Sequence, residues 1–462
     1  MDPIDLCYAG AARQAQLIKE RVVSARELID ATLRQIDSLN PRLNAYRTVF
    51  ADQALETAAA IDNVAAGRFD GPLLGVPVAI KDDTDIENET TPWGTNAPIP
   101  RASHDAEVVA RLRRSGAIII GKTNVSELTA WPWTSTSTWG ITRNPWDTAR
   151  TPGGSSGGSA TAAATGMCGV ALGSDGGGSV RYPAALTGLF GFKPQRERIP
   201  LGHQHADGWN GLLSYGSLSR TVADAARFLD ATTDPTTDQS FTDVLAALDA
   251  NPRRLRIALS FNPPPGSMAK LSNASRRAVE DTADLLRSIG HDIIESEIDY
   301  TRLAMRNATI RYMAGVHQDA ASLAHPVELA RSTKRLARIG ALIPQAMIDR
   351  SRRSEERISA SINRIFDDAD IVLTPIAGSP PPLIDTTSDR GIIRSLLASN
   401  NGAWAMPWNV IGQPAASVPA GLDTNGLPVA VQLCGRRNDD ATVLHLAEQI
   451  ETARPWAHLR PL

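Results

Sequence analysis

Residues 153–181 decide the fold, and they read GGSSGGSATAAATGMCGVALGSDGGGSVR. Extended to residue 191, this segment holds 12 of the chain's 35 glycines and only two charged residues. A flexible linker is also rich in glycine, but it does not carry apolar residues such as Val170 and Leu172. Glycine among apolar residues indicates backbone that packs closely against other backbone or against a ligand. The segment is therefore predicted to lie inside a core.

Two glycine-rich nucleotide-binding motifs do not fit this segment. A P-loop requires a lysine directly after its last glycine, and no lysine follows the glycines here. The dinucleotide fingerprint requires G-x-G-x-x-G, and the glycines between 153 and 158 lack that spacing. Three glycines directly before Ser179 instead allow several backbone N–H groups to point into one concavity. That is the geometry of an anion nest or an oxyanion hole.

Outside this segment, short apolar runs alternate with stretches that have a helical pattern. Apolar runs bounded by turn residues predict buried strands, and Lys81 follows directly on the first of them. This alternation favours an α/β architecture with a sheet covered on both faces. The predicted strands lie within 71–80, 117–120, 369–375, 418–419 and 429–433, and the predicted helices within 51–67, 105–115 and 440–452, with a capping box at Ser24 and Glu27.

Composition excludes several classes of protein. The net charge of −3 supplies no basic surplus for gripping nucleic acid or an anionic membrane. The three cysteines (Cys7, Cys168 and Cys434) are too few and too scattered for a disulfide framework or a thiolate metal site. No secretory signal and no apolar run long enough for a membrane span is visible. We therefore expect a cytoplasmic globular protein.

At this point the residues resemble the amidase signature family. The two serine segments and the lysine strand match its motifs, and further matches run in order along most of residues 70–225 and 370–450. One departure is Gly176, which stands where the family more often has Thr or another side chain. The matching segments are 75–82, 121–124, 142–147, 153–159, 172–181, 191–194, 219–224, 412–415 and 426–432.

The resemblance implies a Ser–cisSer–Lys triad. Ser179 would be the nucleophile, Ser155 the bridging serine after a cis peptide bond, and Lys81 the base. The backbone N–H groups of Gly176, Gly177, Gly178 and Ser179 would form the oxyanion hole. Lys81 can act as a base only when it is neutral, so burial must bring its pKa well below about 10.4. No cofactor and no metal is expected.

The resemblance also implies the architecture. The expected fold is one α/β domain, residues 1–462, with a mixed, mostly buried β-sheet covered by helices on both faces. Within it we assign 1–70 to N-terminal helices, 71–229 to the catalytic core, 230–368 to a variable helical insertion and 369–462 to completion of the core.

Other residues are assigned supporting roles. Asp175 and Arg181 are the only charges in the glycine-rich segment, so we expect them to pair and brace the loop. Ser156 is expected to be a structural hydrogen-bond donor, and His203 and His205 to be solvated loop residues rather than metal ligands. Five tryptophans lie in segments that flank the motifs, and for any one of them packing in the core is favoured over a role in the pocket. Four of the five are taken as candidates for the substrate pocket: Trp131, Trp133, Trp209 and Trp404.

The predicted function is hydrolysis of a carboxylic amide to an acid and an amine or ammonia. One alternative is the amidase (glutaminase) component of a tRNA-dependent amidotransferase, which shares every motif above and requires a partner subunit. An ester or carbamate hydrolase of the same family is a second alternative, and a catalytically silent binding protein is a third. The expected partner is a small-molecule amide, without nucleic acid or membrane, and a homodimer is allowed.

Overall fold

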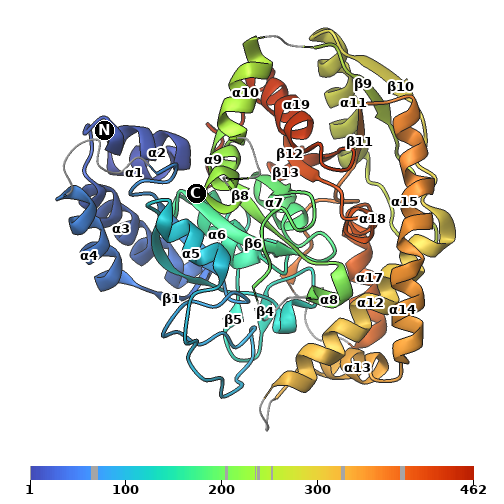
Figure 1. Ribbon diagram of the computed structural model, residues 1–462, viewed down its shortest axis with the longest axis horizontal. Helices are drawn as coiled ribbons and strands as arrows, with labels where there is room; N and C mark the ends of the chain where they lie inside the picture. The colour runs from blue at the N-terminus through green and yellow to red at the C-terminus, as the bar shows by residue number, and fades with distance from the viewer. Residues whose placement is uncertain are drawn as a thin grey trace.

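A single mixed sheet runs through the protein in the computed structural model (Figure 1). The structure describes residues 2–63, 71–202, 207–234, 236, 240–250, 253–323, 328–384 and 391–461. Its eleven strands are, in order across the sheet, β1 (Tyr46–Val49), β3 (Ile118–Thr123), β2 (Pro77–Lys81), β6 (Val170–Asp175), β8 (Ser214–Ser219), β7 (Phe190–Lys193), β12 (Ala415–Leu422), β13 (Pro428–Cys434), β11 (Ile371–Pro375), β9 (Arg256–Leu259) and β10 (Asp292–Glu295). A separate two-stranded hairpin is formed by β4 (Ser135–Thr136) and β5 (Gly140–Ile141).

Both parallel and antiparallel pairs occur in the sheet, as the predicted mixed α/β fold requires. Strand β2 runs parallel to both of its neighbours, β3 and β6. Strands β6, β8, β7, β12, β13 and β11 are joined by antiparallel pairs, and β9 pairs in parallel with β11 and β10. The carboxyl end of β2, which is Lys81, therefore lies in the interior of the sheet rather than at an edge.

Helices cover both faces of the sheet. The N-terminal helices α1 to α4 pack with α6 on one face, and α5, α9, α10, α11 and α19 pack on the other. The helices are α1 (Pro3–Cys7), α2 (Gly10–Lys19), α3 (Ala25–Leu43), α4 (Ala51–Asp62), α5 (Glu107–Arg114), α6 (Gly157–Ala164), α7 (Arg181–Thr187), α8 (Gly208–Gly211), α9 (Val222–Thr232), α10 (Phe241–Ala250), α11 (Asn273–Ser288), α12 (Thr301–Ser322), α13 (Arg331–Gly340), α14 (Gln345–Arg353), α15 (Glu355–Asn363), α17 (Ile392–Ala398), α18 (Met406–Val410) and α19 (Asp440–Ala453).

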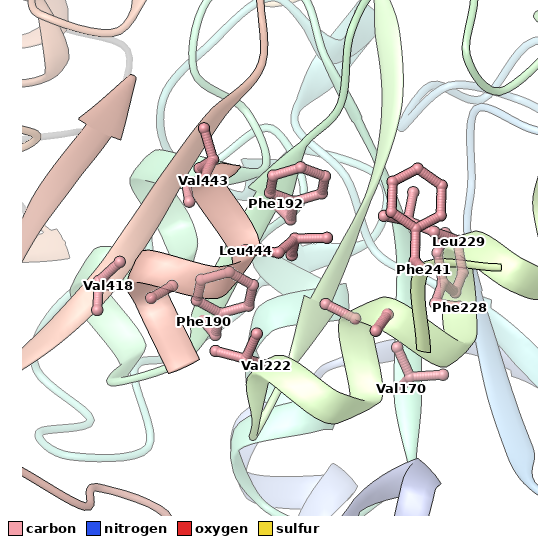
Figure 2. Close-up of a cluster of buried hydrophobic side chains, with 14 of the residues drawn as sticks. Val170, Phe190, Phe192, Val222, Phe228, Leu229, Phe241, Val418, Val443 and Leu444 are labelled. Atoms are coloured by element: carbon pink, nitrogen blue, oxygen red, sulfur yellow. The ribbon is translucent and has the colours of Figure 1, made fainter. Parts of the chain in front are cut away.

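The side chains of β2 alternate between the two faces of the sheet, so this strand contributes to a hydrophobic cluster on each face. Val78 and Ile80 belong to one hydrophobic cluster, whereas Ala79 between them belongs to the cluster on the opposite face. Successive side chains of a strand point to opposite faces, so a strand buried on both sides reads as a continuous apolar run. Figure 2 shows the first cluster, in which Phe190 and Phe192 of β7 lie among side chains of α9, α10 and α19.

Two parts of the chain differ from the sequence-based assignment. The N-terminal region is not helical throughout, because β1 adds an antiparallel edge strand to β3. The middle region is not a purely helical insertion, because it contributes β9 and β10 to the same sheet. Each of these strands is only four residues long, and such short runs carry too little periodicity to be distinguished from loop or helix.

The glycine-rich segment packs as tightly as its composition predicts. A Cβ atom on Gly158, in the first turn of α6, would lie 2.4 Å from the carbonyl oxygen of Asn124 and 2.5 Å from that of Ala45. A Cβ atom on Gly154 would lie 2.6 Å from the backbone nitrogen of Trp133. Because Gly154 and Gly158 have no side chains, the loop that carries Ser155 can pack directly against the neighbouring backbone.

Among the described helices, none combines the length with the apolar composition that crossing a bilayer requires.

Gly216 provides a test of this close packing. A Cβ atom at this position in β8 would lie 2.2 Å from the carbonyl oxygen of Phe192, so Gly216→Ala must push β7 and β8 apart. We expect the substitution to lower the free energy of unfolding by about 1–3 kcal/mol in urea titrations. As a control, Gly202→Ala places its Cβ no closer than 3.5 Å to a neighbour, so we expect a change within about 0.5 kcal/mol. Equal effects of the two substitutions would contradict the packing argument.

Candidate active site

Lys81 is the centre of the site, at the end of β2 and with no solvent exposure. Its Nζ atom lies 2.8 Å from Ser155 Oγ and 2.6 Å from Ser174 Oγ. The carboxylate of Asp83 lies 3.2 Å from the same nitrogen. A buried amine thus has three side-chain partners, of which one is the predicted relay serine.

Burial lowers the pKa of Lys81, because the charged ammonium loses its hydration inside the protein. The carboxylates of Asp83 and Asp175 act in the opposite direction, since negative charge nearby stabilises the ammonium. Desolvation is the largest of these effects, so the amine loses its proton more easily than an exposed lysine does. This is the electrostatic condition for a lysine to serve as a base.

Ser155 lies in the loop that leads into α6 and is buried. The peptide bond between Gly154 and Ser155 is cis, as the resemblance implies. The loop is fixed from outside by Gly154, which packs on the backbone of Trp131 and Trp133. As a result the hydroxyl of Ser155 faces the amine of Lys81.

Ser179 lies in the turn after β6, is partly exposed, and lines a cavity of about 300 Å³. Gly178 before it has φ = 120°, in the region that favours glycine. The structure brings Lys81 and Ser155 into hydrogen-bond contact. Within the described residues, however, no hydrogen bond joins Ser155 to Ser179. The predicted nucleophile is therefore accessible to a substrate, and the last link of the relay is not formed in this structure.

The predicted oxyanion hole needs one correction. The backbone N–H of Gly178 donates to Asp175 Oδ1 at 2.7 Å, so it stabilises the turn instead of facing the cavity as a free donor. The Asp175 carboxylate lies against the turn that follows it, where it accepts hydrogen bonds from the backbone N–H groups of Gly178, Val180 and Arg181. Gly176, Gly177 and Ser179 remain as candidate donors.

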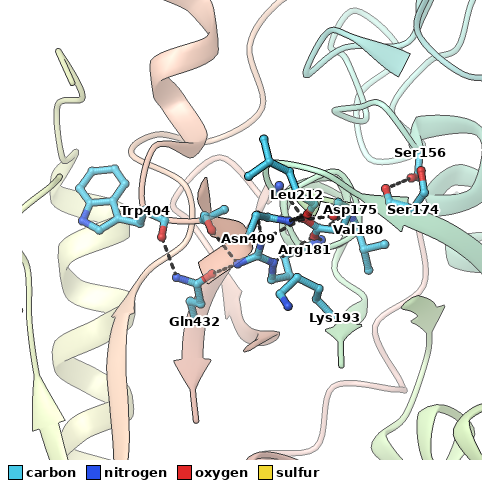
Figure 3. Close-up of polar contacts among 12 residues, drawn as sticks. Ser156, Ser174, Asp175, Val180, Arg181, Lys193, Leu212, Trp404, Asn409 and Gln432 are labelled. Carbon is cyan, nitrogen blue, oxygen red and sulfur yellow. Dashed lines mark hydrogen bonds and ion pairs between the residues drawn. The ribbon is translucent and has the colours of Figure 1, made fainter. Parts of the chain in front are cut away.

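Asp175 and Arg181 form a fully buried, two-pronged ion pair (Figure 3). Arg181 Nη2 donates to Asp175 Oδ1 at 2.9 Å, and Nε donates to Oδ2 at 3.0 Å. Burial alone would raise the pKa of Asp175, but the guanidinium outweighs it and holds this pKa below its usual range. Asn409 and Gln432 complete the cluster by bonding to the carboxylate and the guanidinium, respectively.

Sequence reasoning missed Asp83, Ser174, Asn409 and Gln432. Asp83 follows Lys81 by two residues, which was a usable signal, because a carboxylate so close to a buried lysine is a natural partner. Ser174 precedes Asp175 and also accepts, through its carbonyl, a hydrogen bond of 3.4 Å from Ser156 Oγ (Figure 3). Asn409 comes from a distant helix, so no local pattern could have identified it.

The cavity beside Ser179 has an apolar wall. Among its described lining residues there is no Asp, Glu, Lys, Arg or His. Its larger side chains come from the segment around Trp131, from α7, α8 and α12, and from α17 and α18 before β12. They are Trp131, Tyr182, Trp209, Met305, Tyr312, Met313, Leu396 and Met406.

Two of the four predicted pocket tryptophans line this cavity and two do not. Trp131 and Trp209 line it. Trp133 stacks behind Trp131 with ring centroids 5.1 Å apart. Trp404 is fully buried and donates from Nε1 to the carbonyl of Phe261 at 3.1 Å. Trp133 and Trp404 are buried, and neither is among the residues that line the cavity.

The position of Trp209 explains the unusual glycine at residue 176. A Cβ atom on Gly176 would lie 2.7 Å from the indole ring, and a Cβ on Gly315 would lie 2.6 Å from it. The ring also makes an edge contact with Tyr312, and its Nε1 donates to Asp319 at 2.7 Å. The indole therefore occupies the space that a side chain at position 176 would need.

No group of three or more His, Cys, Asp or Glu side chains placed to hold a metal ion occurs among the described residues. His203 and His205, which were predicted to be solvated, lie outside the described ranges.

Comparison with known proteins gives consistent matches along the whole chain. The Amidase family model matches residues 27–444. AmiB2 of Mycobacterium tuberculosis (strain ATCC 25618 / H37Rv), named as a candidate amidase, is 46% identical over 463 residues, which covers 100% of this chain and 99% of that protein. AmiA2 of the same strain, also named as a candidate amidase, is 40% identical over 458 residues, with 96% of this chain and 92% of that protein covered. The structure of 6-aminohexanoate cyclic dimer hydrolase complexed with substrate is similar with a TM-score of 0.88 at 26% identity, with 98% of this chain and 99% of that chain covered.

The buried ion pair gives a stability prediction. Arg181→Met leaves the Asp175 carboxylate buried without its cation, so we expect a loss of about 3–5 kcal/mol in the free energy of unfolding. Arg364→Met is the matched control, because Arg364 and its partner Asp299 are 62% and 54% exposed. An exposed pair contributes about 0–1 kcal/mol, so the control should unfold at nearly the wild-type urea concentration. Similar losses in both variants would show that the Asp175–Arg181 pair does not brace the site.

Proposed function

The chain belongs to the amidase family, and from this premise we propose that it cleaves its substrate through an acyl-enzyme on Ser179, with Ser155 and Lys81 as the proton relay. The chain is an amide-hydrolysing enzyme, because the family model matches most of it and a relative named as an amidase aligns with its whole length. The observation that carries the proposed mechanism is the 2.8 Å contact between Lys81 Nζ and Ser155 Oγ, next to the cavity that Ser179 lines.

Acylation would begin when Ser179 Oγ attacks the amide carbonyl. Its proton passes to Ser155 while Ser155 gives its own proton to the neutral amine of Lys81. The backbone N–H groups of the turn around Gly177 would stabilise the negative oxygen of the tetrahedral intermediate. Reversal of the relay protonates the departing amine, and water then cleaves the acyl-enzyme along the same path.

The cavity supports uncharged substrates with an apolar or aromatic acyl group. Its described lining offers indole rings, phenol rings and thioethers, which gain free energy from the apolar area they bury. A charged group placed there would lose its hydration with no ionic partner. This argues against the glutaminase alternative, whose free amino acid substrate carries two charges. Esters and carbamates fit the same acyl transfer, so this alternative stays open.

A cytoplasmic location and the absence of nucleic acid or a membrane as partner stay predictions from the sequence, which allows a homodimer without predicting one.

The relay is tested by single and double substitutions. Lys81→Met keeps the apolar stem but removes the base, and we expect kcat to fall by at least about 10². Ser155→Ala interrupts the relay and should also be severe. The double variant should be scarcely slower than the worse single variant, since groups that act as one unit are not additive. Circular dichroism verifies that each variant is folded. Losses that multiply would mean that the two residues act independently.

The pH dependence of kcat/KM should report the ionisation of Lys81. The base is active only after it has lost its proton, so activity rises with pH. Because burial lowers this pKa, the midpoint of the rise should lie below the ordinary lysine value of about 10.4. A profile without this rise, or one whose midpoint matches free lysine, is incompatible with a buried neutral base.

Substrate preference tests the apolar cavity. We expect aryl and alkyl amides to exceed succinamate-like amides and free amino acid amides in kcat/KM. Trp209→Ala should reduce this preference by about 10- to 100-fold, because an aromatic wall contributes about 1.5–3 kcal/mol. Trp139→Ala, at an indole outside the cavity lining, should leave the preference unchanged. Faster turnover of the charged amides by the wild type would show that the cavity has been misread.

A further inference from the structure

Asp83 is a buried carboxylate beside the base that the mechanism above does not use. It follows Lys81 by two residues and lies 3.2 Å from its Nζ atom. It is also joined to the amine through Ser174, whose hydroxyl donates to Asp83 Oδ2 and accepts from Lys81 at 2.6 Å. Its other oxygen accepts a hydrogen bond of 3.1 Å from Thr84. The carboxylate is therefore held in place from both sides.

We propose that Asp83 is a positioning residue for the reaction: it orients the amine of Lys81 toward Ser155 and stabilises the ammonium that forms during acylation. This proposal rests on the proposed role of Lys81 as the base.

The orientation follows from the kinds of atom around the amine. A neutral amine has two N–H groups and one lone pair. The carboxylate of Asp83 and the backbone carbonyl of Ser174, 3.2 Å from Nζ, can only accept hydrogen bonds. The hydroxyl of Ser174 donates its hydrogen bond to Asp83, so its oxygen acts as an acceptor toward the amine. The two N–H groups are therefore drawn to this side. The lone pair is left for the hydroxyl of Ser155, which is the direction that proton abstraction requires.

The stabilisation follows from charge and burial. When Lys81 accepts the proton, an ammonium forms where no water can hydrate it, and a carboxylate 3.2 Å away offsets that cost. Asp175 also faces the amine, but its charge is already balanced by Arg181. Asp82 does not face it, because Asp82 pairs with Lys122 and Arg47. Tyr215, bonded to Thr84, faces Asp83, and burial raises its pKa so that it stays neutral. Among the described carboxylates, Asp83 is thus the one that forms an ion pair with the base.

Replacing Asp83 by asparagine keeps the shape but removes the charge. The pKa of Lys81 should fall further, because the opposing effect of the carboxylate is lost while desolvation remains. The rise of kcat/KM with pH should therefore move to lower pH, by about 1–3 units. The plateau of kcat should fall at least about tenfold, since the amine is both a weaker base and less well oriented.

The control is Asp82→Asn, at the adjacent buried carboxylate that also pairs with a lysine. It should reduce stability, yet the midpoint of the pH profile should stay at the wild-type value. Should Asp83→Asn fail to fold, Ser174→Ala removes the hydroxyl between the carboxylate and the amine while keeping the charge. That variant should lower kcat at least about tenfold with a pH shift below about one unit, because the Asp83 carboxylate still faces Lys81.

The outcomes separate the two proposals. If Lys81→Met and Ser179→Ala keep their activity, the proposed mechanism is wrong. If these two are inactive but Asp83→Asn keeps the wild-type pH profile and kcat, the mechanism stands and the role of Asp83 is wrong. An unchanged kcat in folded Ser174→Ala overturns the role of Asp83 in the same way. A shift of the pH profile equal to that of Asp82→Asn would show a purely structural effect.

Discussion

Burial of the Lys81 amine is the constraint on which the rest of the site depends. A lysine is rarely found without solvent exposure, because its ammonium loses several kcal/mol of hydration. Here three side chains meet it, those of Ser155, Ser174 and Asp83. They come from a loop before α6, from the end of β6 and from the turn after β2. The fold must therefore bring three separate segments to the carboxyl end of one interior strand.

The sheet and the glycines together meet this requirement. Strand β2 runs parallel to β6, so the carboxyl ends of the two neighbouring strands lie side by side, and Lys81 and Ser174 come together there. The loop with Ser155 can approach only because Gly154 and Gly158 have no side chains to meet the backbone beside them. The buried Asp175–Arg181 pair then braces the turn that carries the proposed nucleophile, Ser179.

Local sequence patterns predicted much of this arrangement. Features that depend on contacts between distant parts of the chain could not be predicted in this way. The apolar run before Lys81 and the glycines around Ser155 and Ser179 predicted buried strands and tight loops, because their periods and compositions are local properties. The bracing pair of Asp175 and Arg181 could be inferred because no other charge lies nearby. Strands β9 and β10 could not be inferred, since their pairing with a distant strand, rather than their own four residues, makes them strands.

Which residues line the cavity could not be predicted from local sequence either. Four tryptophans near the motifs looked alike in the sequence, yet Trp209 lines the cavity and Trp404 lies in the core. The indole of Trp209 fits beside Gly176 and Gly315, which lie 139 positions apart in the chain, so no local pattern marks its place. The carboxylate of Asp83, by contrast, could have been identified from the sequence, since it follows the proposed base, Lys81, by only two residues.

The mechanism that we propose requires a covalent intermediate on Ser179, activated by the relay of Ser155 and Lys81. The most direct test is mass spectrometric peptide mapping after reaction with a serine-directed fluorophosphonate. The account predicts a single adduct on Ser179, formed much more slowly in Lys81→Met and absent in Ser179→Ala. An adduct on Ser155, or labelling that survives Ser179→Ala, would contradict the account.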